Sequence, residues 1–546
     1  MKHLIRKPEA LIFLFCLWVM LTSNDAYWRV VAANDSADFH NGSTFIAAIG
    51  ILTLGLISLV MLLLALGAMT RSILIVALMG SAAIGYFTSE FGVLIDPSML
   101  INAFETDTAE AADLLTTPLI VKFLLFGVLP ASVVWKYPLE RRRIPTALRD
   151  RTIALLLALS MIAGPLYFSQ KEVVSFGRNH REAQYMIAPI NAISSGISLV
   201  RDAFETPPVY KVVGADAVHL SADLEGRRPR VHALILGETA RAANFSLGGY
   251  SRSTNPELQQ QSNLLYLSGS SCGTATATSL PCMLTLGGRT GFERSESRYQ
   301  DNLLDIAARS GYSVYWVDNG NGCKGLCDRV DHRDVHQIGL QSICSEDACY
   351  DEVLIHELSK LLQQVSRDTL IVLHQMGSHG PAYFRRYPDE FRTFVPDCRS
   401  QNFGDCSIQE IVNAYDNTIR YTDHVIAAAI EVLNAESERF DVSLTYVSDH
   451  GESLGEHNLF LHGMPYKLAP EEQKQVPFIT WSAHQDFQDV GMGSRCLGTS
   501  EQPGISHDNL FHTELGLLDI DTSVYDSQLD IFSGCRAAKH LTAASL

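Results

Sequence analysis

Basic side chains are scarce in this chain of 546 residues. Lysine and arginine together number 42, against 60 aspartates and glutamates, and the formal net charge is −18. A nucleic-acid-binding surface needs a basic footprint, so the balance argues against that class of function. It also argues against broad attraction to an acidic membrane surface. If the substrate is anionic, a local group of cations must bind it.

Cysteine is almost absent from the first half of the chain. Of 11 cysteines, only Cys16 precedes residue 272. The other ten are Cys272, Cys282, Cys323, Cys327, Cys344, Cys349, Cys398, Cys406, Cys496 and Cys535. An even number at mostly short spacings suggests five disulfides and an oxidising compartment such as a bacterial periplasm. The spacings of Cys323/Cys327 and Cys344/Cys349 would also suit a zinc ribbon, but that would leave the other cysteines unexplained.

Charged residues are also rare in five apolar runs of the first third. Since a membrane span needs about 20 mostly apolar residues, we predict a transmembrane domain of five helices. The runs are residues 10–23, 45–69, 73–88, 118–135 and 152–168. The first is short enough for a signal peptide, but no clear cleavage site precedes Asn24 and four further runs follow.

The loops between these runs differ in charge. Lysine and arginine precede the first run and lie between the second and third and between the fourth and fifth, whereas residues 89–117 carry only acidic charges. The positive-inside rule places the amino terminus inside and everything after residue 168 outside. We predict a transmembrane domain at residues 1–170, an interfacial helix with a linker at 171–225, and a periplasmic catalytic domain at 226–546.

From Val231 onward, strand-like runs alternate with helical patterns, which is typical of an α/β domain with a mostly parallel sheet. Four of these runs end in carboxylates or imidazoles. The residues that follow them are Glu238, Asp318, His374 to His379, and Asp449 with His450. Open α/β sheets build their sites outside the carboxyl ends of their strands, so the pattern predicts a metal site there.

The segment SCGTATATSLP at Ser271–Pro281 is rich in hydroxyl groups and lies between Cys272 and Cys282. A threonine is a poor nucleophile unless a base or metal lowers its pKa. Zn²⁺ bound by Glu238, Asp449 and His450 would do so, and Mn²⁺ also suits such ligands. Composition does not distinguish among the candidate nucleophiles Thr274, Thr276 and Thr278. It also fits a turn whose hydroxyls only make local hydrogen bonds.

Asn102, Thr106 and Glu110 recur at every fourth residue of an outer loop and would share one helical face. Spacing alone favours a polar, solvated face on an interfacial helix.

Five motifs resemble the lipid A phosphoethanolamine transferases, which are membrane-anchored members of the alkaline phosphatase superfamily. They are GETAR at 237–241, SCGTATATSLPCM at 271–283, NAYDNTIRYTD at 413–423, SDHGESLGE at 448–456 and SHDNLFHT at 506–513. The likeness covers the five apolar runs and the whole outer domain. It implies an α-helical five-span transmembrane domain followed by an alkaline-phosphatase-like, sulfatase-type α/β domain.

The resemblance also implies roles for individual residues. The family's zinc ligands match Glu238, Thr276, Asp449 and His450, and its nucleophile matches Thr276. Its substrate-side or second-metal positions match Lys324, His379 and His462. Its contacts to the donor lipid match Asn102, Thr106 and Glu110, which favours a binding role over the solvated face.

The implied reaction transfers phosphoethanolamine from phosphatidylethanolamine to a phosphate of lipid A through a phosphothreonine intermediate. One tightly bound zinc ion is expected, with a second left open, in a monomer of the bacterial inner membrane. Such modification implies resistance to polymyxin and other cationic peptides.

A phosphoglycerol transferase, or a transferase acting on another envelope glycan or lipid, is the alternative. A sulfatase is disfavoured because its C/S-x-P-x-R segment is missing, and a non-catalytic relative would have lost the ligands.

Overall fold

The computed structural model describes residues 6–38, 42–105, 108–140, 142–204, 208–221, 226–320, 322–335, 343–344, 349–483 and 504–534. The chain divides into two compact units. The first comprises Met1–Leu100, Leu115–Phe204 and Asn458–Phe460, and the second comprises Ile101–Leu114, Glu205–His457 and Leu461–Leu546. The functional division at residues 170 and 225 stays a prediction. The structure adds that Ile101–Leu114, a loop between apolar helices, belongs to the second unit.

The first unit is helical. Its helices are α2 (Pro8–Thr22), α3 (Asp25–Asp38), α4 (Gly42–Leu64), α5 (Thr70–Phe91), α8 (Thr117–Lys122), α9 (Leu129–Lys136), α10 (Ile144–Phe168), α11 (Gln170–Asn179) and α12 (Ile190–Phe204). The 3₁₀ helices η1 (Gly67–Met69) and η3 (Arg181–Tyr185) and the π-helix η2 (Phe123–Val128) join them, and α6 (Pro97–Glu105) begins in this unit. Helix α4 packs closely on α10, because a Cβ at Gly55 would lie 2.9 Å from the Cβ of Met161.

Four helical segments are long and apolar enough to cross a membrane: Ser43–Leu64, Gly67–Phe91, Thr117–Lys136 and Ile144–Phe168. Helix α2 and the start of α3 form a pair bent by 66° that would make a fifth span if counted as one. Four to five apolar helices therefore confirm the predicted fold of this region. The expected run 45–69 ends earlier, since Gly67 adopts a positive φ of 56° and starts the next segment.

The second unit is an α/β domain. Its strands are β1 (Val218–His219), β2 (Arg230–Gly237), β3 (Leu264–Ser270), β4 (Ser313–Asp318), β5 (Asp331–Asp334), β6 (Thr369–His374), β7 (Asp441–Ser448), β8 (Ser453–Leu454), β9 (Phe460–Leu461), β10 (Gln475–Ser482) and β11 (Ile520–Asp521). Its helices are α7 (Thr108–Leu114), α13 (Thr276–Met283), α14 (Gly288–Gly291), α15 (Arg294–Ser297), α16 (Leu303–Arg309), α17 (Glu352–Leu362), α18 (Ile408–Ala435), α19 (Glu471–Lys474) and α21 (Leu510–Leu517).

The main sheet has seven strands in the order β3-β10-β7-β2-β6-β4-β5. Strands β7, β2, β6, β4 and β5 run parallel, and β10 runs antiparallel to both β3 and β7. This confirms the mostly parallel sheet. Gly237 pairs with Ser448 and Leu236 pairs with His374, so β2, β7 and β6 end at the same edge. The residues that follow these strands are therefore neighbours.

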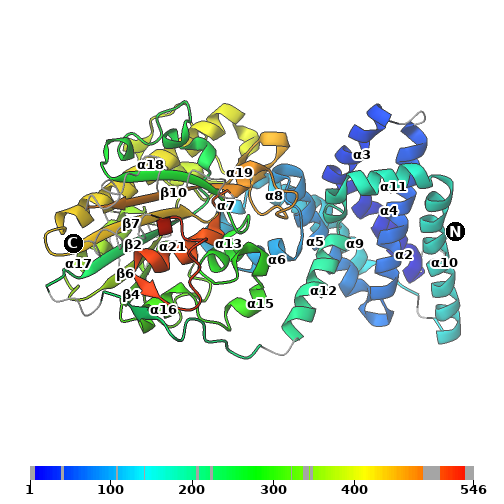
Figure 1. Ribbon diagram of the computed structural model, residues 1–546. Coiled ribbons are helices and arrows are strands. Elements are labelled where there is room, and N and C mark those ends of the chain that lie inside the picture. Colours follow the sequence, from blue (N-terminus) through cyan, green and yellow to red (C-terminus); the bar gives the residue numbers. More distant parts are fainter. Residues whose placement is uncertain are drawn as a thin grey trace. The chain divides into compact units, whose positions relative to one another are not determined.

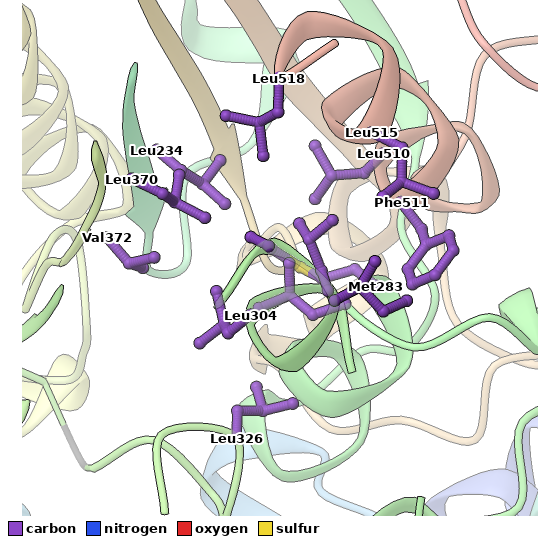
Figure 2. Packing of buried hydrophobic residues seen from close by; sticks show 14 of the residues in the cluster. Leu234, Met283, Leu304, Leu326, Leu370, Val372, Leu510, Phe511, Leu515 and Leu518 are labelled. Atoms are coloured by element: carbon purple, nitrogen blue, oxygen red, sulfur yellow. The ribbon is translucent and has the colours of Figure 1, made fainter. Parts of the chain in front are cut away.

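The core lies against both faces of this sheet. Figure 2 shows Leu234 and Leu370 facing Met283, Leu304 and Leu515, which come from α13, α16 and α21. These side chains are fully or almost fully buried. Helices α17 and α18 contact β4, β6 and β7 without joining this cluster and cover the other face (Figure 1).

Helix α18 also fixes the loop after β2. It begins with a capping box in which Ser407 and Glu410 exchange hydrogen bonds with each other's backbone N–H groups. From its buried face, the Tyr415 hydroxyl donates to the Thr239 carbonyl at 2.8 Å and accepts the Arg241 N–H at 2.9 Å. These bonds hold the backbone on either side of Ala240 and so position Glu238.

Replacing Gly237 by alanine should destabilise the second unit. The added Cβ would lie 2.4 Å from the Tyr446 hydroxyl oxygen, and Tyr446 is fully buried. Overpacking of this kind costs about 1–3 kcal/mol, so the thermal unfolding midpoint of the purified protein should fall. Gly291→Ala is the matched control, since nothing lies within 4 Å of the Cβ that this substitution would add. Equal midpoints for the two variants would contradict this packing.

Candidate metal centre

Glu238 and Asp449 follow two neighbouring parallel strands, and the backbone aligns them. The Asp449 N–H donates to the Gly237 carbonyl at 2.9 Å, which continues the pairing of β2 with β7. Asp449 Oδ1 accepts the N–H groups of Thr239 at 3.1 Å and His450 at 2.7 Å. One carboxylate oxygen is thus held by backbone donors, and the other is free to face Glu238.

Three ligand atoms converge at this edge. His450 Nε2 lies 3.3 Å from Glu238 Oε1 and 3.3 Å from Asp449 Oδ2. The ligand atoms of the three residues all lie within 4.8 Å of one another, and the residues are buried. This grouping of two carboxylates and one imidazole could hold a metal ion.

The donor set of these residues fits a cation. The Nδ1 atom of His450 lies 2.9 Å from the Gly451 carbonyl, so Nδ1–H donates there and Nε2 points its lone pair at the carboxylates. Asp449 Oδ2 is buried without a hydrogen-bond partner among the described residues. Acceptor atoms that face one another in a buried site repel unless a cation or proton lies between them.

The pKa shifts of the three residues also indicate a positive charge between Glu238, Asp449 and His450. Burial and the charge of Glu238 raise the pKa of Asp449 to about 6. Burial would raise the pKa of Glu238, but the hydrogen bond and charge of His450 lower it well below its ordinary value. Burial would lower the pKa of His450, but Asp449 and Glu238 raise that pKa to about 10. A divalent cation would supply the charge that the imidazolium proton otherwise supplies.

The Thr276 hydroxyl joins this group. Its Oγ1 lies 3.0 and 3.1 Å from the two carboxylate oxygens of Glu238 and 3.3 Å from His450 Nε2. Thr276 is the first residue of α13, where the partial positive charge of a helix N-terminus favours an anionic oxygen. Thr274 points elsewhere, because its hydroxyl donates to the Met464 carbonyl at 2.5 Å.

The loop that carries Thr276 is tied down on both sides. A Cys272–Cys282 disulfide closes it, and the Ser279 hydroxyl of α13 donates to the Asp449 carbonyl at 2.5 Å. His507 bridges the same parts, because Nδ1 accepts the Cys272 N–H at 3.0 Å and Nε2 lies 2.9 Å from the Ser448 carbonyl. The sequence motif around His507 did not indicate this bridge, and nothing in the sequence distinguished Ser279 from the other hydroxyl residues of its segment.

Three further disulfides link cysteines that follow one another in the sequence: Cys323–Cys327, Cys344–Cys349 and Cys398–Cys406. Cys496 and Cys535 lie outside the described residues, and the buried Cys16 is free. Cys323 and Cys327 also lie near enough to Asp328 to suggest a second metal group. Their disulfide leaves no thiolate there to bind one.

His379 and His462 lie beside the metal group. The ring centroid of His462 is 4.3 Å from that of His450 and 5.5 Å from that of His379. His462 Nδ1 lies 3.0 Å from Glu452 Oε2, and the Tyr383 hydroxyl donates to Glu452 Oε1 at 3.0 Å. Glu452 is fully buried and orients the His462 ring, a role that the spacing of its motif did not indicate.

The remaining predicted residues are placed as follows. Lys324 Nζ lies 3.9 Å from Glu105 Oε2, and 9% of the lysine side chain is exposed. Asn102 lies on α6 and is partly exposed. Thr106 lies outside the described residues, and Glu110 lies on α7 with its side chain outside them.

Comparisons of the sequence match both parts of the chain. The Sulfatase profile matches residues 232–520, and the profile of phosphoethanolamine transferase EptA/EptB matches residues 53–204. The chain is 35% identical to phosphoethanolamine transferase EptA of Escherichia coli K12, over 98% of this chain and 99% of that protein. It is 33% identical to phosphatidylethanolamine transferase Mcr-2 of Escherichia coli, over 94% of this chain and 95% of that protein.

Solved structures agree. The integral membrane lipooligosaccharide phosphoethanolamine transferase A (EptA) of Neisseria meningitidis matches with a TM-score of 0.92 at 32% identity, over 96% of this chain and 98% of that one. The C-terminal periplasmic domain of phosphoethanolamine transferase EptC from Campylobacter jejuni matches with a TM-score of 0.52 at 38% identity, over 59% of this chain and 97% of that one. With its apolar helices, the protein is a multi-pass membrane protein.

Replacing Asp449 by asparagine should remove bound metal. The change deletes the charge of an oxygen that faces Glu238 and His450, so the metal content after dialysis should fall by about tenfold or more. Inductively coupled plasma mass spectrometry of the purified full-length protein measures it.

Asp441→Asn is the control, because it makes the same chemical change at the opposite end of β7, where the side chain is 37% exposed. Equal metal content in the two variants would refute the site.

Proposed function

Because the chain belongs to the phosphoethanolamine transferase family and its second unit is a sulfatase-type domain, we propose that it transfers phosphoethanolamine from phosphatidylethanolamine to a phosphate of lipid A. One observation carries the proposal. The Thr276 hydroxyl lies within 3.3 Å of both Glu238 and His450, in a buried group of acceptor atoms that needs a cation. This is the arrangement that a metal-activated alcohol requires.

Zn²⁺ is the proposed ion, held by Glu238, Asp449, His450 and Thr276. Three oxygen ligands and one imidazole give the four ligands that zinc prefers. When bound, the ion favours the alkoxide of a ligating alcohol over the neutral hydroxyl and offsets charge on a phosphoryl oxygen. One tightly bound ion accounts for the group, and His379 with His462 offers imidazoles for a second.

In the first half-reaction, Thr276 Oγ1 releases its proton to solvent and attacks the phosphorus of phosphatidylethanolamine. The new Oγ1–P bond forms as the bond from phosphorus to the glycerol oxygen breaks, and diacylglycerol leaves. Glu238 orients Oγ1, with both of its carboxylate oxygens within 3.1 Å. His462 or His379 donates the proton that the departing glycerol oxygen needs. Support for His462 comes from Glu452, which holds Nδ1 and turns Nε2 away from itself.

In the second half-reaction, a phosphate oxygen of lipid A attacks the phosphothreonine. The bond between phosphorus and Thr276 Oγ1 breaks, which restores the threonine oxygen. Negative charge grows on the phosphoryl oxygens in both steps, and Lys324 is proposed to offset it. Asn102, Thr106 and Glu110 are proposed to contact the donor lipid.

The charges of the loops support an orientation in which the second unit lies in the periplasm and the helices cross the bacterial inner membrane. Both lipid substrates would then diffuse within the outer leaflet of that membrane. The disulfides agree with an oxidising compartment. The proposed working form is a monomer.

Mass spectrometry of lipid A from cells that express the protein tests the proposal. The wild type should add phosphoethanolamine, and Thr276→Ala should reduce the product by several orders of magnitude, because it removes the nucleophile. Thr274→Ala is the matched control. It deletes a hydroxyl of the same loop that donates to the Met464 carbonyl, so transfer should persist.

If lipid A from cells that express the wild type carried no phosphoethanolamine, lipid A would not be the acceptor. If Thr276→Ala modified lipid A fully, Thr276 would not be the nucleophile.

A further inference from the structure

Glu105, the last residue of α6, lies among three cations of the second unit. Its Oε1 lies 2.5 Å from Arg294 Nη2 and 3.9 Å from Arg298 Nη2, and its Oε2 lies 3.9 Å from Lys324 Nζ. We call Arg294, Arg298 and Lys324 the cationic cluster. In a chain with a net charge of −18, three cations around one carboxylate need an explanation.

The cationic cluster lies next to the nucleophile. The other terminal nitrogen of Arg294, Nη1, donates to the carbonyl of Ala277 at 2.6 Å, and Ala277 directly follows Thr276 on α13. Arg298 packs on Gly325, where a Cβ would lie 3.2 Å from its Cγ, and Gly325 directly follows Lys324. The three cations therefore come together from α15, from the residue after it and from the Cys323–Cys327 loop.

Glu105 does not satisfy the cluster. It carries one negative charge against the two positive charges of Arg294 and Arg298, and of these two arginines only Arg294 lies within hydrogen-bond distance of it. Its Oε2 is buried with no hydrogen-bond partner among the described residues. A phosphate monoester carries about 1.5 to 2 negative charges near pH 7 and three strong acceptor oxygens, so it matches both the excess charge and the number of donors. Arginine guanidinium groups bind such oxygens well.

We propose that Arg294 and Arg298 bind the phosphate monoester of the acceptor beside Lys324, and that Glu105 occupies the site of the two arginines until the acceptor displaces it. The inference rests on the proposed function. The donor is a phosphodiester with a single negative charge, which fits the excess charge less well. The acceptor phosphate in this site would lie near the start of α13, from where its oxygen can attack the phosphorus carried by Thr276.

Displacement of Glu105 need not release the rest of its segment. Asp113, near the end of α7, pairs with Arg386 at 2.9 Å and with Arg385, and it accepts a hydrogen bond from Gln401 at 3.2 Å. The two arginines that pair with Asp113 are not part of the cationic cluster. The carboxylate of Glu105 can therefore leave while α7 remains docked.

Steady-state kinetics of the detergent-solubilised full-length protein test the site, with fluorescent phosphatidylethanolamine as donor and purified lipid A as acceptor. Arg298→Gln should raise the KM for lipid A about tenfold, as expected for a lost charged hydrogen bond, with a much smaller change in kcat and in the donor KM. Arg289→Gln is the matched control. It removes the same charge from α14, where the guanidinium stacks on Tyr466, and should leave the KM for lipid A unchanged.

A rise in the donor KM instead would assign the cluster to the phosphodiester and overturn the acceptor site. Unchanged KM values for both lipids would overturn it as well. Failure of the proposed function looks different, because the wild type itself would then release no diacylglycerol and modify no lipid A.

Glu105→Gln tests the displacement. Removing the competing charge should lower the KM for lipid A severalfold. An unchanged KM for lipid A would show that Glu105 does not compete with the acceptor phosphate. A lower thermal unfolding midpoint in the same variant would assign Glu105 a purely structural role.

Discussion

Two buried carboxylates held side by side by strand register are the constraint on which the rest of the structure depends. The pairing of Gly237 with Ser448 brings Glu238 and Asp449 to one point, and His450 adds a lone pair there. Such a group is unfavourable in a buried site without a positive charge. The surrounding bonds to Tyr415, Ser279 and the Cys272–Cys282 loop all serve to keep these atoms in place.

Charge also organises the space around Thr276, the proposed nucleophile. The protein is acidic as a whole, yet arginine and lysine side chains gather beside α13, and an internal carboxylate lies among them. In the proposed reaction, the buried ligands hold the attacking oxygen, and Arg294 and Arg298 bind the incoming phosphate. Both depend on Thr276 being at the start of a helix whose next residue contacts Arg294.

The sequence was sufficient to predict that Glu238, Asp449 and His450 lie at one edge of the sheet. The apolar, β-branched runs that form β2 and β7 end directly before these polar residues. Composition was not sufficient to choose Thr276 from its neighbours, since alternate threonines in a loop differ only in the direction of their side chains, and the choice rested on the family resemblance. The break at Gly67 depends on one positive φ, which apolar composition does not reveal. Ile101–Leu114 belongs to the second unit, where Glu105 and Asp113 pair with arginines far away in the chain, and the sequence pattern does not reveal such long-range pairs.

X-ray absorption spectroscopy at the zinc edge of the active, full-length protein would show directly which atoms bind the ion. We expect a first coordination shell of oxygen and nitrogen with a single imidazole and no sulfur. A shell containing sulfur, a shell with several imidazoles, or full activity in protein that holds no metal would contradict it.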